Sequence, residues 1–263
     1  MKDRTQVFAM GSIVILTAVL IISIFVRWLN METKASEEDA KLEDVLKVSD
    51  EDENSNDVQK PEIEPVFVSS DPSYFDDALF IGDSRTVGLC EYGTLKNADY
   101  FASTGMSIYK LWDETLSVED VGRVSLYELL NLKQYGKIYI MLGINELGYK
   151  TEKTIAETEE TIQKIKEQQP KATIYLSANL HVTKVRSERD KLINNKKIDK
   201  FNQKLETLTD NKGVYYIDVN EEFDDENGNL RSECTGDDVH VYAKYYQDWS
   251  KWLCENTVRR GSN

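Results

Sequence analysis

Residues 78–85 read Ala-Leu-Phe-Ile-Gly-Asp-Ser-Arg, a short apolar run that ends in Gly-Asp-Ser. A segment compatible with a helix follows it. This layout predicts a buried strand with the hydroxyl of Ser84 at its C-terminal tip and at the start of a helix. Ligands of open α/β sheets bind at such strand tips. A serine in this place is therefore either a helix cap or a nucleophile.

Apolar runs and amphipathic stretches alternate along the rest of the C-terminal part. The predicted strands are Leu79–Ile81, Tyr100–Ala102, Ile138–Leu142, Thr173–Ser177 and Val214–Val219. The predicted helical stretches are Val118–Leu132, Ile155–Gln168, Leu192–Leu208 and Lys244–Glu255. Strands separated by helices need crossover connections, which predicts a parallel sheet. Because continuous apolar strands indicate burial on both faces, we expect a three-layer α/β/α sandwich with a five-stranded parallel sheet.

Polar residues follow several of these strands. They are Gly82-Asp83-Ser84, Ser103-Thr104-Gly105-Met106-Ser107, Gly143-Ile144-Asn145-Glu146 and, past the last strand, Gly236-Asp237-Asp238-Val239-His240. Since the carboxyl ends of parallel strands lie at one edge of a sheet, we expect the four segments to meet there.

These segments contain the parts that a serine nucleophile needs. A serine hydroxyl is a weak nucleophile without a base, and His240, with Asp237 three residues before it, supplies one. Gly105 has no side chain, so its backbone N–H can approach a substrate closely. Asn145 offers a side-chain amide. With the backbone N–H of Ser84 these groups would give an oxyanion three donors.

The chain resembles the SGNH/GDSL hydrolases, a family of esterases, lipases and acyl-processing enzymes, over about residues 75–257. Four blocks match in order: Phe80-Ile81-Gly82-Asp83-Ser84, Gly105, Gly143-Ile144-Asn145-Glu146 and Asp237-Asp238-Val239-His240. The resemblance implies a flavodoxin-like SGNH fold. It implies a catalytic triad of Ser84, His240 and Asp237, with an oxyanion hole formed by Ser84, Gly105 and Asn145. We expect no cofactor and no metal.

The sequence departs from the family pattern at three positions. Glu146 stands where the third block usually has Asp, and Asp238 stands where glycine is common. Arg85 follows the serine where many relatives carry an apolar residue; it either pairs with Asp83 or Glu146 or meets a polar or anionic group of the substrate.

Other residues near the predicted strand tips are weaker candidates for substrate contact. They are Arg85, Met106, Glu146, Tyr149 and Asn179. The chain has two histidines, and the second, His181, has no acid shortly before it in the sequence. We expect His181 in the core or at the rim of the site.

Composition excludes several classes of function. The 263-residue chain has a formal net charge of −15, which argues against a nucleic-acid partner because phosphate binding needs clustered Lys and Arg. Its three cysteines, Cys90, Cys234 and Cys254, are too few for a disulfide scaffold and lack the spacing of a zinc site. We expect three unpaired thiols, with a Cys234–Cys254 bridge as the alternative.

The N-terminal part differs from the rest. Residues 1–29 are expected to form a cytoplasmic stub and a transmembrane anchor, since Phe8–Val26 is uncharged and about long enough to cross a bilayer. Lys2 and Arg4 before it predict that the N-terminus is cytoplasmic and the rest is exported. A cleaved signal peptide is the alternative. Residues 30–65 are expected to be a disordered acidic linker, because twelve acidic residues face three lysines from Glu37 to Pro65.

Residues 66–263 are then an extracellular hydrolase domain on a membrane tether. Location and resemblance together suggest that it removes short acyl groups, O-acetyl above all, from a carbohydrate or cell-wall polymer. Two alternatives stay open at this point. The same triad would serve an O-acyltransferase that works with a membrane acyl-donor partner, and the fold would also serve a non-catalytic surface binding module.

Overall fold

The structure is a computed structural model in which residues 65–258 are described. The chain divides into two units, residues 1–62 and 63–263, and the described residues belong to the second. The expected anchor and nearly all of the expected linker lie outside the described residues. Within residues 65–258, no helix combines the length and the apolar character needed to cross a membrane.

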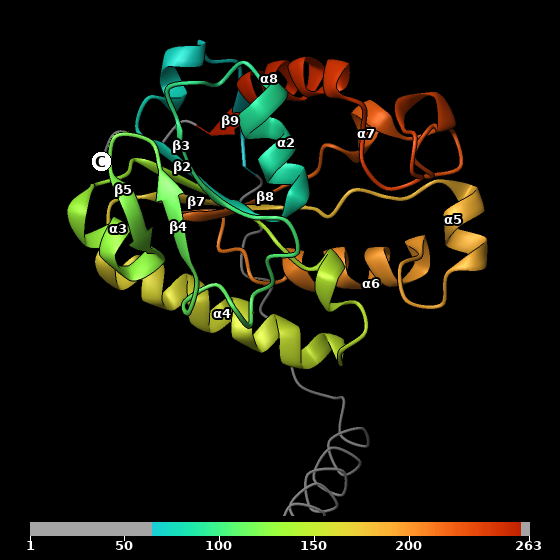
Figure 1. Ribbon diagram of the computed structural model, residues 1–263, viewed down its shortest axis with the longest axis horizontal. Coiled ribbons are helices and arrows are strands. Elements are labelled where there is room, and N and C mark those ends of the chain that lie inside the picture. The colour runs from blue at the N-terminus through green and yellow to red at the C-terminus, as the bar shows by residue number, and fades with distance from the viewer. Residues whose placement is uncertain (1–64, 259–263) are drawn as a thin grey trace, which may run out of the picture. The chain divides into compact units, whose positions relative to one another are not determined.

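A five-stranded parallel sheet forms the centre of the domain, as predicted (Figure 1). Its strands are β2 (Ala78–Gly82), β3 (Asp99–Ala102), β6 (Lys137–Met141), β7 (Thr173–Ser177) and β8 (Val214–Ile217). Their order is β3-β2-β6-β7-β8, and every neighbouring pair is parallel. The chain first pairs β3 on one side of β2 and later adds β6 on the other side. This reversal of direction makes the carboxyl end of β2 the expected ligand site of the sheet.

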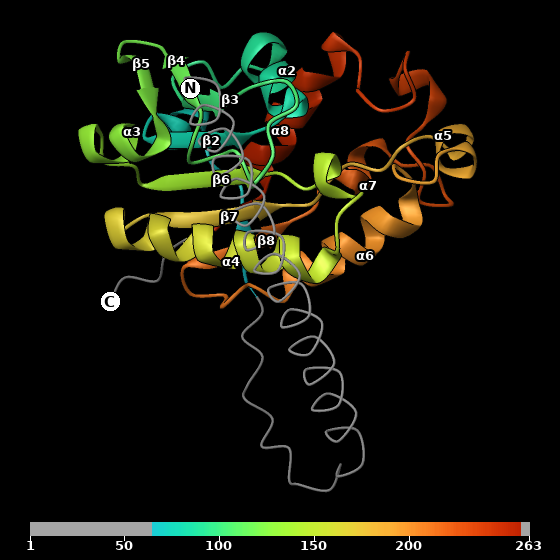
Figure 2. The ribbon, with the colours of Figure 1, turned by 60° about the horizontal axis from the view of Figure 1, so that its bottom comes forward.

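Helices cover both faces of the sheet. Figure 2 shows α4 (Thr151–Gln168) and α6 (Asn195–Glu206) on one side, and α2 (Ser84–Tyr92) and α8 (Tyr246–Glu255) on the other. Each face of the sheet packs against its helices in a separate hydrophobic core, and successive residues of a strand point to opposite faces. Leu79 and Ile81 of β2 pack into the core beneath α4 and α6, whereas Ala78 and Phe80 pack into the core beneath α2 and α8.

Shorter elements complete the domain. They are the helices α3 (Leu126–Leu132), α5 (Lys184–Arg189) and α7 (Asn220–Phe223), the 3-10 turns η1 (Pro72–Phe75), η2 (Ile144–Glu146), η3 (Ser232–Cys234) and η4 (Ala243–Tyr245), the antiparallel pair β1 (Phe67–Val68) and β9 (Thr257–Val258), and the antiparallel pair β4 (Thr115–Val118) and β5 (Gly122–Ser125). The pairing of β1 with β9 brings the two ends of the described domain together.

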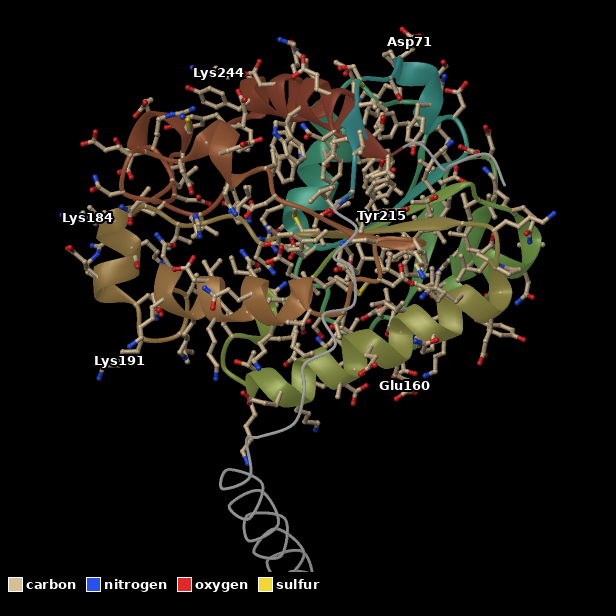
Figure 3. The ribbon with its side chains drawn as sticks, turned by 180° about the vertical axis from the view of Figure 1, so that it is seen from behind. Asp71, Glu160, Lys184, Lys191, Tyr215 and Lys244 are labelled. Atoms are coloured by element: carbon tan, nitrogen blue, oxygen red, sulfur yellow. The ribbon has the colours of Figure 1, made fainter. Side chains whose placement is uncertain are left out.

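One face of the sheet carries a row of aromatic rings across all five strands. Tyr100, Phe80 and Tyr139 stack with ring centroids 5.1 and 4.6 Å apart. Tyr139 stacks on Tyr175 at 4.4 Å, and Tyr175 meets Tyr215, which Figure 3 labels, at 6.1 Å. Cross-strand aromatic pairs contribute roughly 0.2–1 kcal/mol each. The row therefore helps to fix the strands whose carboxyl ends carry the site.

The prediction of a helical stretch over Val118–Leu132 is wrong in its first half. Residues up to Ser125 form the β4–β5 hairpin, and the helix α3 begins only at Leu126. Asp120 in the turn and Gly122 at the start of β5 have positive φ, 58° and 96°, which a helix does not allow. Ser125 then starts α3 through a capping box with Glu128. The five predicted strands and the other three helical stretches are confirmed, with shifts at their ends.

All three cysteines are free, as expected. Cys234 is buried, and Cys90 and Cys254 are partly buried. The alternative of a bridge between Cys234 and Cys254 is therefore wrong for this structure.

Candidate active site

Ser84 is the first residue of α2, directly beyond the tip of β2. The strand and the helix lie so close at Gly82 that a Cβ there would stand 2.0 Å from Thr86 Oγ1 and 2.8 Å from the carbonyl oxygen of Met141. Glycine is the residue that fits this approach. Asp83 caps the helix, since its carboxylate accepts a hydrogen bond from the backbone N–H of Arg85. Asp83, rather than Ser84, therefore fills the cap role, which leaves the Ser84 hydroxyl free for another partner.

That partner is His240. Ser84 Oγ lies 2.8 Å from His240 Nε2, although 156 residues separate them in the chain. His240 Nδ1 lies 2.7 Å from Asp237 Oδ2. If Nδ1 carries the proton that Asp237 accepts, Nε2 is left as the acceptor for the serine hydroxyl. The three side chains that the sequence singled out are thus in one hydrogen-bonded line.

The carboxylate of Asp237 is held in place by the backbone. Its Oδ1 accepts hydrogen bonds from the N–H groups of Val239, at 3.0 Å, and of His240, at 2.8 Å. Burial opposes ionisation, but the His240 backbone and ring together with the Val239 N–H outweigh it and lower the pKa of Asp237 to about 2. Asp237 is therefore a carboxylate at neutral pH, and its Oδ2 can accept a hydrogen bond from His240 Nδ1.

Strand order places two possible oxyanion donors on either side of Ser84. Gly105 follows β3 and Asn145 follows β6, and these strands flank β2. Gly105 has a φ of +77°, and no atom lies within 4 Å of where its Cβ would be, so the backbone there borders open space. Asn145 donates one amide N–H to the carbonyl oxygen of Met106 at 2.8 Å. A side-chain amide has two N–H groups, so one remains available.

Arg85 belongs to a buried network under the nucleophile. It is 1% exposed, and it donates from Nε and Nη2 to the two carboxylate oxygens of Asp83, with Nε–Oδ1 at 2.9 Å. Its Nη2 also donates to Asn179 Oδ1 at 2.8 Å. The pairing with Asp83 is confirmed. The alternative, contact with a polar or anionic group of the substrate, stays a prediction; Nη1 of the guanidinium is buried without a hydrogen-bond partner. Arg85 ties the start of α2 to the segment after β7.

Glu146 supports the loop that carries Gly105. Its Oε1 accepts a hydrogen bond from the backbone N–H of Ile108, and the side chain is buried. Burial raises the pKa of Glu146 to about 7; the nearby Asp83 adds to this effect, while the Ile108 N–H and Arg85 oppose it. Asn145 and Glu146 thus bind the backbone on both sides of Ser107. These bonds fix the loop after β3, which carries Gly105, against the loop after β6.

The remaining candidates for substrate contact divide by exposure. Met106, Glu146 and Asn179 are buried, at 2, 2 and 0% exposure, and they pack inside the domain. Contact of these side chains with a substrate stays a prediction. Tyr149 is 60% exposed, and its ring packs on Tyr109 at 5.0 Å. Of the five, Tyr149 is the one whose side chain is exposed to solvent.

His181 does not replace His240. Its Nδ1 lies 2.5 Å from Asp224 Oδ2, and its Nε2 lies 2.8 Å from Asp199 Oδ1, so both ring nitrogens meet carboxylates. Burial opposes protonation, but Asp224 and Asp199 outweigh it and raise the pKa of His181 to about 8. Both acids follow His181 in the chain, by 18 and 43 residues, so no short sequence motif marks the pairing. Across residues 65–258, no cluster of three His, Cys, Asp or Glu side chains is arranged to hold a metal ion.

Asp238 explains one departure from the family pattern. Its φ is +71°, a backbone conformation that glycine adopts freely and that Asp tolerates better than most residues. This turn brings Asp237 and His240 to the same side of the loop. The sequence reasoning missed Thr183, which hydrogen-bonds Asp238 from the other side, because no motif marks it.

Residues 80–247 match the family model of the GDSL-like lipase/acylhydrolase family. The chain belongs to this family. Members hydrolyse esters through a serine, so the GDSL-like chain is a serine ester hydrolase. No curated protein matches it.

Solved structures share the fold of this GDSL-like domain. One from Streptococcus pneumonia, assigned as a platelet activating factor, is 23% identical, with a TM-score of 0.52 over 74% of this chain and 85% of that one. A GDSL-like lipase from Bacteroides thetaiotaomicron is 17% identical, with a TM-score of 0.51 over 69 and 86% of the two chains. A protein from Bacteroides fragilis, assigned as an acylhydrolase, is 14% identical, with a TM-score of 0.52 over 76 and 95%.

Proposed function

We propose that Ser84, His240 and Asp237 form the catalytic triad of this esterase. The observation that carries the proposal is the hydrogen-bonded line from Ser84 Oγ to His240 Nε2 and from His240 Nδ1 to Asp237. His240 takes the proton of Ser84 as the oxygen attacks the ester carbonyl. The imidazolium then gives that proton to the leaving alcohol, and an acyl-enzyme remains. Water, deprotonated by His240, attacks the acyl carbon and restores Ser84.

The negative oxygen of each tetrahedral intermediate needs donors. We assign this role to the backbone N–H groups of Ser84 and Gly105 and to the amide N–H of Asn145 that Met106 does not use. Such donors stabilise charge that develops in the transition state more than the substrate itself. The start of α2 adds its positive field at the same place.

The substrate that we propose is a short acyl ester, above all an O-acetyl group, on a carbohydrate or cell-wall polymer. Half-burial of Ser84 and the exposure of His240, whose side chain is 41% accessible, support a site that reaches an ester on a large polymer. The same exposure favours water as the acceptor of the acyl group. The N-terminal segment 1–29 is proposed to anchor the enzyme in the membrane, with the hydrolase domain outside the cell.

Ser84→Ala tests the triad. We expect the variant to lose turnover of p-nitrophenyl acetate and labelling by a fluorophosphonate probe, while its thermal unfolding stays that of the wild type. Ser125→Ala is the matched control, because Ser125 also stands at the start of a helix but bonds Glu128 rather than a histidine. It should lower stability and leave labelling intact. Wild-type turnover by Ser84→Ala would reject the assignment.

The acceptor and the substrate need a second experiment. The full-length enzyme in detergent should release acetate from acetylated glycans or wall fragments at the same rate with and without a deacetylated glycan. If the added glycan instead becomes acetylated as free acetate falls, the enzyme is a transferase. If no acetylated polymer is cleaved faster than p-nitrophenyl acetate, the proposed substrate class is wrong.

A further inference from the structure

The loop that holds the two triad partners of Ser84 has an unusual turn at its centre. Its ends are fixed by an antiparallel bridge between Thr235 and Val241. Between them, Asp238 has a φ of +71°, whereas Asp237 and His240 on either side bond each other. A residue other than glycine holds such a backbone conformation only when its surroundings fix it. The contacts of Asp238 therefore determine the shape of the loop.

Asp238 is bound through both its backbone and its side chain to one residue, Thr183. The backbone N–H of Thr183 donates to the carbonyl oxygen of Asp238 at 3.1 Å. The Thr183 hydroxyl donates to Asp238 Oδ1 at 2.8 Å. Arg189 lies 3.6 Å from the other carboxylate oxygen. Two bonds at a fixed spacing set both the position and the orientation of the turn.

Thr183 is itself a fixed point. It is 3% exposed, and its hydroxyl also caps α5 by accepting a hydrogen bond from the backbone N–H of Arg186. The residues before it are held as well: Val182 bonds Asn195 and Leu230, and His181 is bound between two carboxylates. Figure 3 shows α5, which carries the labelled Lys184, at the edge of the domain. Thr183 thus connects the segment after β7 to the triad loop.

We propose that Thr183 and Asp238 are positioning residues of the reaction, which hold the Asp237–His240 pair at the distance that Ser84 requires. Neither side chain belongs to the proposed triad or oxyanion hole. They act through the turn, and the inference rests on the proposed triad. A displacement of about 1 Å in a catalytic group can reduce the rate by about 100-fold, so loss of this pair should reduce turnover and leave substrate binding nearly unchanged.

Thr183→Val removes the hydroxyl and keeps the shape of the side chain. For the full-length enzyme acting on p-nitrophenyl acetate, we expect kcat to fall by about 10- to 100-fold and KM to change by less than about 3-fold. Thr183→Ser keeps the hydroxyl and should retain most of the activity. Thr161→Val is the matched control, because Thr161 is also a buried threonine with one side-chain partner, Trp112, and lies on α4 away from the loop.

Asp238 is tested by three replacements. Asp238→Asn keeps the acceptor for Thr183 and tolerates positive φ, so it should retain activity. Asp238→Ala loses both and should be at least as slow as Thr183→Val. The double variant should be no slower than Asp238→Ala, because the Thr183–Asp238 side-chain contact is already absent there. Asp238→Gly relieves the backbone but loses the side-chain bonds; it should fold as stably as the wild type and still lose kcat.

The split between kcat and KM separates positioning from a general loss of stability. The loss of kcat at nearly unchanged KM should occur in Thr183→Val, be absent in Thr161→Val and be largely restored in Thr183→Ser. Equal kcat in the wild type, Thr183→Val and Asp238→Gly would overturn the inference while leaving the triad standing. If the wild type shows no turnover that depends on Ser84, the triad itself fails.

Discussion

The two histidines of this chain stand in similar surroundings and differ in one partner. His240 Nδ1 meets Asp237 at 2.7 Å, and His181 Nδ1 meets Asp224 at 2.5 Å. The second nitrogen of His240 faces the hydroxyl of Ser84, whereas that of His181 faces a second carboxylate, Asp199. The side chain of His240 is 41% exposed, and that of His181 is 13% exposed.

This difference shows that a His–Asp pair by itself does not define an active site. A histidine between two carboxylates is stabilised as the cation, and it has no lone pair left to accept a proton. A histidine between one carboxylate and a hydroxyl can accept that proton and return it. The chemistry thus depends on the third group, and His181 serves as an ionic link between the segment after β7, α6 and the loop after α7.

Removal of His240 should give the largest effect. Since His240 is the proposed base, we expect His240→Ala to reduce kcat/KM for p-nitrophenyl acetate by about 10⁴- to 10⁶-fold. Thermal unfolding should change little, because the ring is partly exposed. His181→Ala is the natural comparison and should keep kcat/KM within about 5-fold of the wild type. A reversed order of the two effects would exchange the roles of the histidines.

Asp237→Asn should give the next largest effect. The amide cannot accept the Nδ1 proton as a carboxylate does, so it favours the wrong tautomer of His240. We expect kcat to fall by about 10³- to 10⁴-fold, with KM nearly unchanged. Asp224→Asn makes the same change beside His181 and should leave kcat within a few-fold of the wild type. A loss of less than 10-fold in Asp237→Asn would mean that Asp237 does not orient the base.

The effect of His181→Ala should be on stability. The change leaves Asp224, whose side chain is 13% exposed, without its cationic partner. We expect the free energy of unfolding to fall by about 2–3 kcal/mol in urea. An unchanged midpoint would show that the ionic link contributes nothing. For His240→Ala, measured in the same way, the fall in the free energy of unfolding should be much smaller.

The smallest effect should be the pH dependence of this stability. The folded pKa of His181, about 8, lies above the unfolded value of 6.5, so its contribution is complete below pH 6.5 and is lost as the pH rises through 8. This difference between the folded and unfolded pKa corresponds to about 2 kcal/mol in the free energy of unfolding. We expect the free energy of unfolding of the wild type, measured in urea, to fall from pH 6 to pH 9 relative to that of His181→Ala. Parallel curves for the two proteins would contradict this assignment.

Much of the fold could be read from local patterns. The β2 strand and the Gly-Asp-Ser at its tip, the alternation of strands with helices, and the Asp237–His240 spacing are short-range features that leave a signature in the sequence. The β4–β5 hairpin was missed because apolar residues in Val118–Leu132 also fit a helical period. The positive φ of Asp120 and Gly122 and the capping box at Ser125 decided the outcome there.

The sequence by itself determined which groups are proposed to react: one serine at a strand tip, one histidine with an acid three residues before it, and two donors in later loops. Only the tertiary structure decided which partners the other polar groups take. Arg85 pairs with Asp83 and Asn179, His181 with Asp199 and Asp224, and Thr183 with Asp238, in most cases across tens of residues. Buried polar groups must find partners wherever the packed chain brings them, and no local pattern specifies that distance. The line between Ser84 and His240 spans 156 residues for the same reason, and the order of the strands brings its ends together.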